Sequence, residues 1–560
     1  MSLAERLMYN DVRWLVNWPG RQTEEHRCLR HSRTLDGPLE LPLACLPTVT
    51  SMAARRAWCF SCLSRDFSWP CSRCDRSGLG SRRLVRTSCG GFPNVTTRVK
   101  CPGSFRDPSG FVFQGEDGLV YRQVNRVYEA AYRQALESGL YRGLSEAGLL
   151  IPHEDMPLTY RCTDDACAVL RPRMLPFVSY PYEWGFTQLK EAALLTLEIQ
   201  RRALDYGMSL KDASAYNVQF DGVRGIFVDT LSFEHYREGS PWIAYGQFCR
   251  HFLAPLALMA TKDVRLGKLL QTHMDGIPLD VASSLLPLST WLRGGLLTHV
   301  HLHARTMQRH VAREKQSRHA KAEESARRMS RTAMRALIDH LESAVRGLNC
   351  PKQDTLWADY EDNNQYTAEA VDQKKRIVAD YLARVRPTSV WDLGANTGTY
   401  SRLAAEQAAC VIAIDMDLAC VEMNVRTCRQ HGVTNVLPLC IDLSNPSPGV
   451  GWANTERQSL VERGPADAAL TLALVHHLAI GSNVPLVRVA AFFRQLTSNL
   501  VVEFVPKEDP QTQRLLASRA DIFPNYSKAG FESAFQAEFT LVEAQPLGGC
   551  ERVLYLMKAR

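Results

Sequence analysis

The sequence predicts an α/β protein whose C-terminal part folds around a mostly parallel sheet, preceded by an α+β domain. Two observations predict the sheet. From about residue 389 onward, short apolar runs of strand length alternate with helical segments, and the first run leads into a glycine-rich turn. A short Gly-Gly turn separates the last two runs, so we expect them to form an antiparallel hairpin at the end of the sheet.

Length and composition indicate several globular domains. The chain has 560 residues, against about 100 to 200 in a typical domain. No apolar run approaches the roughly 18 residues that cross a bilayer, and charged residues interrupt the N-terminus, so we expect a cytoplasmic protein without a membrane span or signal peptide. The net charge of +7 is spread over a large surface. It neither indicates nor excludes a nucleic-acid partner.

We divide the chain into four parts. Residues 1–103 are rich in Arg and Cys and lack periodicity, so we predict a disordered extension. Cysteine pairs at this spacing can also form a tetrahedral zinc site, although the spacer between the pairs is shorter than usual. The parts that follow are an α+β domain at 104–300, a charged helical connector at 301–350 and the α/β domain at 351–560. The candidate zinc ligands are Cys59, Cys62, Cys71 and Cys74.

The glycine-rich turn of the C-terminal domain follows its first predicted strand, at residues 388–401. Gly394 and Gly398 would let the backbone approach a ligand that a Cβ atom would exclude. In a doubly wound sheet, such a turn lies outside the carboxyl ends of the strands, where ligands bind. The alternative is that the glycines serve only the sterics of a strand-to-helix turn.

Polar residues end the strands that follow. The second strand ends at Asp415, about twenty residues beyond the turn, where an acid can accept both hydroxyls of a ribose. The third strand ends at Asp442, and the fourth leads to His476 and His477. The fifth strand carries Glu503. These residues predict a site along the carboxyl edge of the sheet.

The order of these elements resembles that of class I S-adenosylmethionine (SAM)-dependent methyltransferases over about 170 residues. The resemblance implies a Rossmann-like seven-stranded sheet and SAM as the cofactor. Asn396 departs from the family, since many members have a second glycine there. The resemblance implies that Asp415 binds the ribose of SAM and that Asp442 lies near the adenine. The residues that it implies for the methionine part are Asp392, Gly394, Asn396 and Gly398.

Further motifs are similar to those of bacterial two-part methyltransferases, some of them nodulation-protein-like. They are Trp357-x-x-Tyr360, the Pro-rich stretch 445–452, the His-His-Leu sequence at 476–478 and the stretch 503–509. The resemblance implies methyl transfer and leaves the acceptor open. We expect a small molecule rather than a macromolecule, and the alternative is a SAM- or nucleotide-binding regulatory protein without turnover.

Three residues are candidates for catalysis. His476 or His477 would remove a proton from the acceptor, because imidazole titrates near neutral pH. The alternative is that one histidine caps the strand and only the other faces the cleft. Glu503 would contact the substrate or take part in a surface ion pair. We expect no metal ion in this site.

The middle domain carries a second pattern. Asp212, followed by Asn217 and later by Asp229 at the end of a strand, resembles the catalytic loop and metal-binding segment of kinase-like phosphotransferases. Arg122 stands where a phosphate-binding lysine would be expected, and no Gly-x-Gly-x-x-Gly precedes it. Three interpretations of this pattern stay open: a kinase-like fold kept for binding, an active phosphotransferase and an unrelated helical domain.

Overall fold

The computed structural model describes residues 98–308, 329–351, 368–517 and 519–560. The four cysteines predicted to bind zinc lie outside these ranges, as does nearly all of the predicted disordered extension. Among the helices in the described ranges, none is both long and apolar enough to cross a bilayer.

The C-terminal domain contains a seven-stranded sheet with the strand order β12-β11-β10-β13-β14-β16-β15. The first five strands in this order are parallel, and β16 runs antiparallel between β14 and β15. The predicted sheet and its C-terminal hairpin are therefore confirmed. The strands are β10 (Ser389–Leu393), β11 (Cys410–Asp415), β12 (Val436–Cys440), β13 (Ala466–Thr471), β14 (Thr497–Phe504), β15 (Phe539–Pro546) and β16 (Val553–Ala559).

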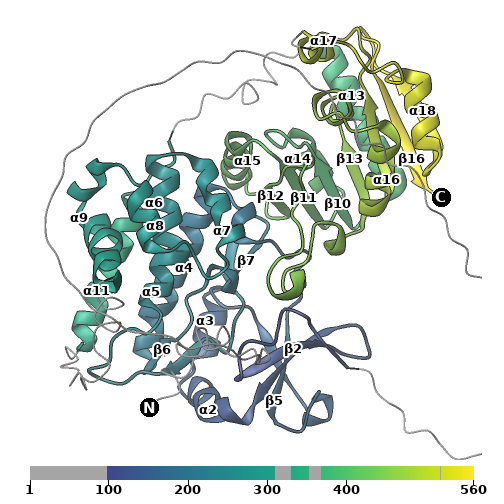
Figure 1. Cartoon of the computed structure of the whole chain (residues 1–560). Helices are drawn as coiled ribbons and strands as arrows, with labels where there is room; N and C mark the ends of the chain where they lie inside the picture. The colour runs from purple at the N-terminus through teal and green to yellow at the C-terminus, as the bar shows by residue number, and fades with distance from the viewer. Residues whose placement is uncertain (1–97, 309–328, 352–367, 518) are drawn as a thin grey trace, which may run out of the picture. The chain divides into compact units, whose positions relative to one another are not determined.

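Both faces of this sheet are buried, as expected for strands that read as continuous apolar runs. Adjacent residues alternate between two cores: Val390 packs in one and Trp391 in the other. The core of Val390 includes side chains from α13 (Ala368–Val385), α14 (Thr399–Ala405) and α15 (Leu418–Gln430). The core of Trp391 includes α16 (Leu486–Leu496), α18 (Lys528–Gln536) and the middle domain. Figure 1 shows α14 and α15 beside β10, β11 and β12.

The middle domain begins with a five-stranded antiparallel sheet in the order β1-β2-β3-β5-β4. The two strands expected at residues 110–124 are present as a hairpin of β2 and β3. Two helices, α2 (Glu129–Glu137) and α3 (Leu140–Glu146), lie in the chain between β3 and β4. The strands are β1 (Val99–Lys100), β2 (Gly110–Gln114), β3 (Val120–Asn125), β4 (His153–Met156) and β5 (Ala166–Pro172).

A long helix, α4 (Phe186–Asp205), leads into the segment with the kinase-like pattern. There β6 (Met208–Leu210) pairs with β9 (Phe233–His235), and β7 (Val218–Asp221) forms a hairpin with β8 (Arg224–Phe227). Figure 1 shows α6, one of the helices that follow in the chain, beside α4. These helices are α5 (Tyr245–Phe248), α6 (Ala254–Thr261), α7 (Leu269–Thr272), α8 (Leu279–Leu285) and α9 (Gly294–Leu296).

Helix α11 (Arg331–Arg346) lies within the segment predicted as a charged connector. Met334, Ile338, Leu341 and Val345 are buried on one face of the helix, and α11 packs against α4. Their spacing is that of an amphipathic helix, so the charges cover only its outer side. This part of the predicted connector belongs to the core of the middle domain.

Candidate cofactor site and active site

A cavity of about 200 Å³ lies at the carboxyl ends of β10, β11, β12 and β13. This is the edge of a doubly wound sheet at which ligands bind. Four of the six predicted cofactor residues line it, namely Gly394, Asn396, Asp415 and Asp442. The structure therefore brings together the glycine-rich turn and the acids that end the next two strands.

Asp415 is held by the main chain of the glycine-rich turn and of its own loop. Its two carboxylate oxygens accept from the Asn396 N–H at 2.7 Å and from the Asp417 N–H at 2.8 Å. Gly394 and Asn396 both adopt left-handed backbone conformations, with φ of 80° and 49°. Burial raises the pKa of Asp415 to about 6. The turn thus fixes the carboxylate while leaving it beside the cavity.

The other two predicted cofactor residues do not line the cavity. Asp392 is buried, accepts a hydrogen bond of 2.6 Å from the Ser401 hydroxyl, and has its pKa raised to about 6 by burial. Gly398 has a φ of 82°, and a Cβ there would lie 2.2 Å from Asn424 Oδ1 on α15. Both residues support the turn from behind, where they fix the packing of the helices.

Apolar residues complete the cavity wall, and no motif in the sequence identified them as candidates. Ile441 and Leu443 flank Asp442, while Leu472, Ala473 and Leu474 follow β13. Their position in the sequence could have identified these residues, because each lies next to a predicted strand end. Carboxylates between apolar side chains suit an adenosine group, whose ribose offers hydroxyls and whose base is flat and apolar on its faces. SAM is therefore the expected cofactor, and the placement of Asp415 at the ribose and of Asp442 near the adenine stays a prediction.

The two histidines occupy different positions. His477 lines the cavity, whereas His476 is completely buried and neither of its ring nitrogens has a hydrogen-bond partner. The ring centroids are 4.1 Å apart. Burial, and after it the charge of Arg552, lowers the pKa of His477 to about 4. Burial also lowers the pKa of His476. Both rings are therefore neutral at physiological pH.

Glu503 lies in a buried group of ion pairs rather than at the cavity wall. Its side chain has no exposed surface, and its carboxylate is 2.7 Å from Lys374 Nζ and 3.5 Å from Arg552 Nη1. Arg552 also donates to Asp509 at 2.6 Å. The expected alternative for Glu503 was an ion pair at the surface; the pair exists but is buried. Nothing in the sequence signalled Lys374, which comes from the distant helix α13.

The residues of the kinase-like pattern also lie together. Arg122 forms an ion pair with Asp229, and the Asn217 amide donates to the Ser232 hydroxyl at 3.1 Å. Burial, and after it the charge of Asp229, raises the pKa of Asp212. The Asp229 carboxylate, which belongs to the segment that resembles a metal-binding one, is thus already paired with a cation of the chain. Phosphotransfer by this group of residues stays one of the three open alternatives.

Several solved structures with distant similarity are methyltransferases. The N-methyltransferase NodS from Bradyrhizobium japonicum WM9 is 10% identical, with a TM-score of 0.26, over 34% of this chain and 97% of that one. The magnesium protoporphyrin IX methyltransferase ChlM from Synechocystis PCC 6803 is 16% identical, with a TM-score of 0.27, over 36% of this chain and 92% of that one. At these values the fold assignment rests on the strand order of the sheet.

A curated relative covers most of the chain, although no protein-family model matches it. Nodulation protein NoeA from Rhizobium meliloti (strain 1021) is 38% identical over 461 residues, which are 81% of this chain and 94% of that protein. This identity extends well beyond the methyltransferase fold into the middle domain. The predicted resemblance to nodulation-protein-like chains is thereby confirmed, and the chain belongs to the NoeA family of nodulation proteins.

Proposed function

We propose that this protein transfers the methyl group of SAM to an acceptor molecule. One observation carries the proposal: the cavity at the carboxyl edge of a methyltransferase-type sheet is lined by Asp415 and Asp442 at one side and by His477 at another. A cofactor whose ribose bonds Asp415 would lie along the ends of β10 to β13. Its reactive methyl group would then be close to the segment that follows β13.

In this proposal the chain acts mainly by positioning. Methyl transfer needs a nucleophile in line with the sulfonium, and holding the two partners in that geometry supplies much of the rate. His477, neutral and at the cavity wall, accepts a hydrogen bond or a proton from the acceptor. His476 packs behind His477 and fixes the orientation of its ring. Glu503 holds Lys374 and Arg552 in place beneath them.

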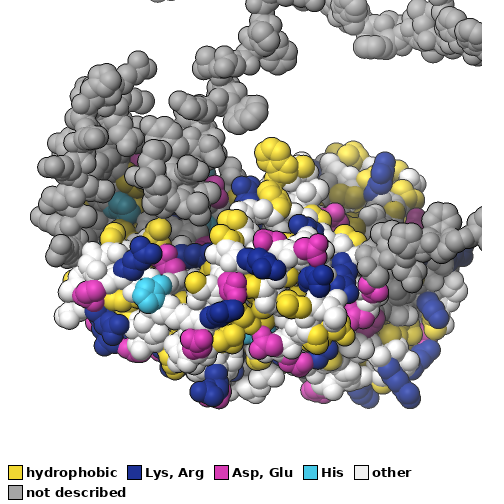
Figure 2. Space-filling model, turned by 90° about the horizontal axis from the view of Figure 1, so that it is seen from below, with side chains coloured by type: hydrophobic (Ala, Val, Ile, Leu, Met, Phe, Trp, Pro, Cys, Tyr) yellow, Lys and Arg dark blue, Asp and Glu magenta, His cyan; other side chains and the backbone are white. Residues whose placement is uncertain are grey.

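The proposed acceptor is a small molecule, and the proposed location is the cytoplasm. On the face shown in Figure 2, Lys and Arg side chains are interspersed with Asp and Glu. A concentrated basic stripe, which is the electrostatic footprint of a nucleic-acid site, is not seen on that described surface. The cavity is also small and lies at the strand ends, which suits a compact acceptor better than a folded macromolecule.

Two measurements test the proposal in sequence. Calorimetric titration with S-adenosylhomocysteine (SAH) should show one site per chain. Incubation with SAM and extracts of wild-type and deletion strains should then release SAH, with more release in the extract that still contains unmethylated acceptor. Binding without any release would favour a regulatory SAM-binding protein. An absence of binding would contradict the cofactor assignment itself.

A further inference from the structure

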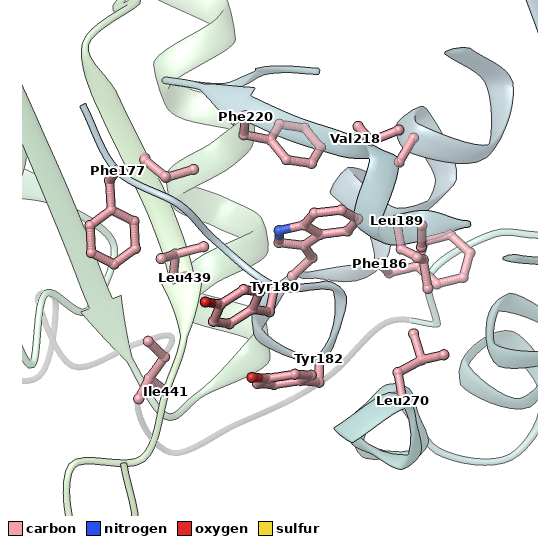
Figure 3. Close-up of a cluster of buried hydrophobic side chains, with 14 of the residues drawn as sticks. Phe177, Tyr180, Tyr182, Phe186, Leu189, Val218, Phe220, Leu270, Leu439 and Ile441 are labelled. Atoms are coloured by element: carbon pink, nitrogen blue, oxygen red, sulfur yellow. The ribbon is translucent and has the colours of Figure 1, made fainter. Parts of the chain in front are cut away.

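The middle domain packs directly against one face of the methyltransferase sheet. The contact lies near the end of β12, where the sheet borders the cofactor cavity. Figure 3 shows Phe177, Tyr180 and Tyr182 of the middle domain in one buried cluster with Leu439 and Ile441, at the end of β12. Phe177 also meets Trp391 of β10 edge to face, with ring centroids 5.6 Å apart. The core that supports the cavity is therefore shared by both domains.

One segment of the methyltransferase domain joins the cavity to this interface. We call residues 443–465, between Asp442 and β13, the bridging segment. At its start, Leu443 and Ser444 line the cavity. Its second half turns to the middle domain, where the buried Glu456 carboxylate accepts from Arg106 at 2.7 Å. The two ends of the segment thus have different partners.

The strongest contact is a buried ion pair between Arg463 and Glu183. Arg463 donates to both carboxylate oxygens of Glu183, at 2.9 and 2.6 Å, and the two side chains are only 2% and 1% exposed. Arg463 also donates to the Val178 carbonyl at 2.8 Å and lies over the ring of Tyr180. A fork of parallel hydrogen bonds fixes orientation as well as distance. Without its partner, either charge would be left unpaired in the core.

Two weaker contacts lie beside the pair. The Gln458 N–H donates to the Tyr180 hydroxyl at 2.8 Å. The guanidinium of Arg457 lies 4.5 Å from the ring centroid of Tyr216, within the range of a cation–π interaction. Tyr216 directly precedes Asn217, one of the residues of the kinase-like pattern. The bridging segment therefore runs from the cofactor cavity to the loop that carries this second pattern.

We infer that the middle domain is a positioning element of the cofactor site, and that the Glu183–Arg463 pair holds the bridging segment so that its first residues form the cavity wall. This inference rests on the proposed binding of SAM in that cavity. It assigns to Glu183 and Arg463 a role in cofactor affinity, although neither residue lines the cavity. The mechanism is mechanical: an unpaired Arg463 would leave the core, and the segment would move with it.

Glu183→Gln tests the inference in the full-length protein, with SAH as the probe. The variant keeps the size of the side chain but removes the charge, so the affinity for SAH should fall by about tenfold or more. Amide hydrogen exchange in the bridging segment should become faster. Arg463→Lys, which keeps the charge but loses the fork, should give a smaller loss of affinity. Tyr180→Phe, a mild change, should also weaken binding severalfold by unpairing the Gln458 N–H.

Glu191→Gln is the control for loss of a charge at this interface. Glu191 of α4 pairs with Arg429 of α15, so this partly exposed ion pair crosses the same interface without involving the bridging segment. The variant should leave SAH affinity and exchange in residues 443–465 unchanged. Wild-type affinity in Glu183→Gln and Tyr180→Phe would overturn the inference alone. So would an equal loss of affinity in Glu183→Gln and Glu191→Gln that follows their loss of thermal stability. A wild-type protein that does not bind SAH would overturn the proposed function and this inference with it.

Discussion

The cofactor cavity and the kinase-like group of residues each contain an acid at the end of a strand or shortly after it. The two acids have different partners. Asp415, at the end of β11, accepts from two main-chain N–H groups and stays beside a cavity. Asp229, two residues after β8, is paired with the Arg122 side chain. Main-chain donors fix a carboxylate without neutralising it. An arginine fixes it by supplying the charge that a ligand or metal ion would otherwise bring.

This difference shows what motif spacing leaves undecided. The spacing predicted both acids, because it reflects where strands end. Whether the acid is available depends on residues from other strands, such as Arg122 on β3, which no spacing within the motif identifies. The comparison makes the methyltransferase site the stronger candidate for chemistry.

The largest expected effect concerns the two histidines of the methyltransferase site. Because His477 lines the cavity, His477→Ala should lower kcat by about a hundredfold or more with little change in SAH affinity. His476→Phe should cost less, since that ring is buried behind it. Single-turnover assays with the identified acceptor would measure both. Equal turnover in the two variants would contradict a direct role for His477.

The pH dependence of turnover sharpens the assignment of His477. The ring accepts a proton or hydrogen bond only in its neutral form, and its lowered pKa keeps it neutral down to about pH 4. Turnover that depends on this ring should therefore be lost as pH falls through about 4, rather than through the ordinary imidazole range. An acid limb near 6.5 that disappears in His477→Ala would contradict the lowered pKa.

The Arg122–Asp229 pair should matter for stability, whereas a comparable pair at the surface should not. Arg122→Met leaves Asp229 without its cation beside the partly buried Asp212, so the free energy of unfolding should fall by about 3 kcal/mol. Arg171 pairs with Glu154 on the same sheet, but both side chains are exposed. Arg171→Met should cost less than about 1 kcal/mol. Equal losses in denaturant titrations would show that the partly buried pair has no special role.

The sequence predicted the sheet better than the site because the two depend on different information. Apolar runs that alternate with helical segments, together with a hairpin at the C-terminal end, were sufficient to predict the seven strands. Four cofactor residues were found because they follow strand ends directly. Glu503 shows the limit: its position on β14 was clear, but its partners Lys374 and Arg552 come from α13 and the terminal hairpin. The bridging segment could not be foreseen, since its partners lie more than 200 residues away in the chain.

Replacing Asp415 and Asp229 by alanine, one at a time, compares the two sites directly. Asp415→Ala removes the proposed ribose acceptor, so SAH affinity should fall by about tenfold to a hundredfold. Asp229→Ala removes an acid of the other site and should leave SAH affinity unchanged. Calorimetry on both variants decides between the sites. A loss of affinity in Asp229→Ala similar to that in Asp415→Ala would mean that the middle-domain acid acts on the cofactor cavity.

The smallest expected effect concerns two alanines in the same strained backbone conformation. Ala473, at the cavity wall, has a φ of 52°, and Ala453, in the exposed part of the bridging segment, has a φ of 53°. Glycine relieves a steric cost of roughly 1 to 2 kcal/mol but adds about 0.4 to 1 kcal/mol of chain entropy in the unfolded state. Either Ala→Gly variant should therefore raise the free energy of unfolding by between about 0 and 1.6 kcal/mol.

The two variants should differ in cofactor binding. Ala473→Gly loosens a residue that SAH must hold still, and the extra backbone freedom of glycine costs about 0.4 to 1 kcal/mol to remove, which corresponds to a severalfold weaker affinity. Ala453→Gly should leave the affinity unchanged, because Ala453 is exposed and the Glu183–Arg463 pair still holds the bridging segment. Calorimetry and denaturant titration on the same preparations measure both quantities. Equal affinities would mean that the strain at Ala473 serves the fold of the segment after β13 and not the cofactor, so the cavity wall would depend on packing alone.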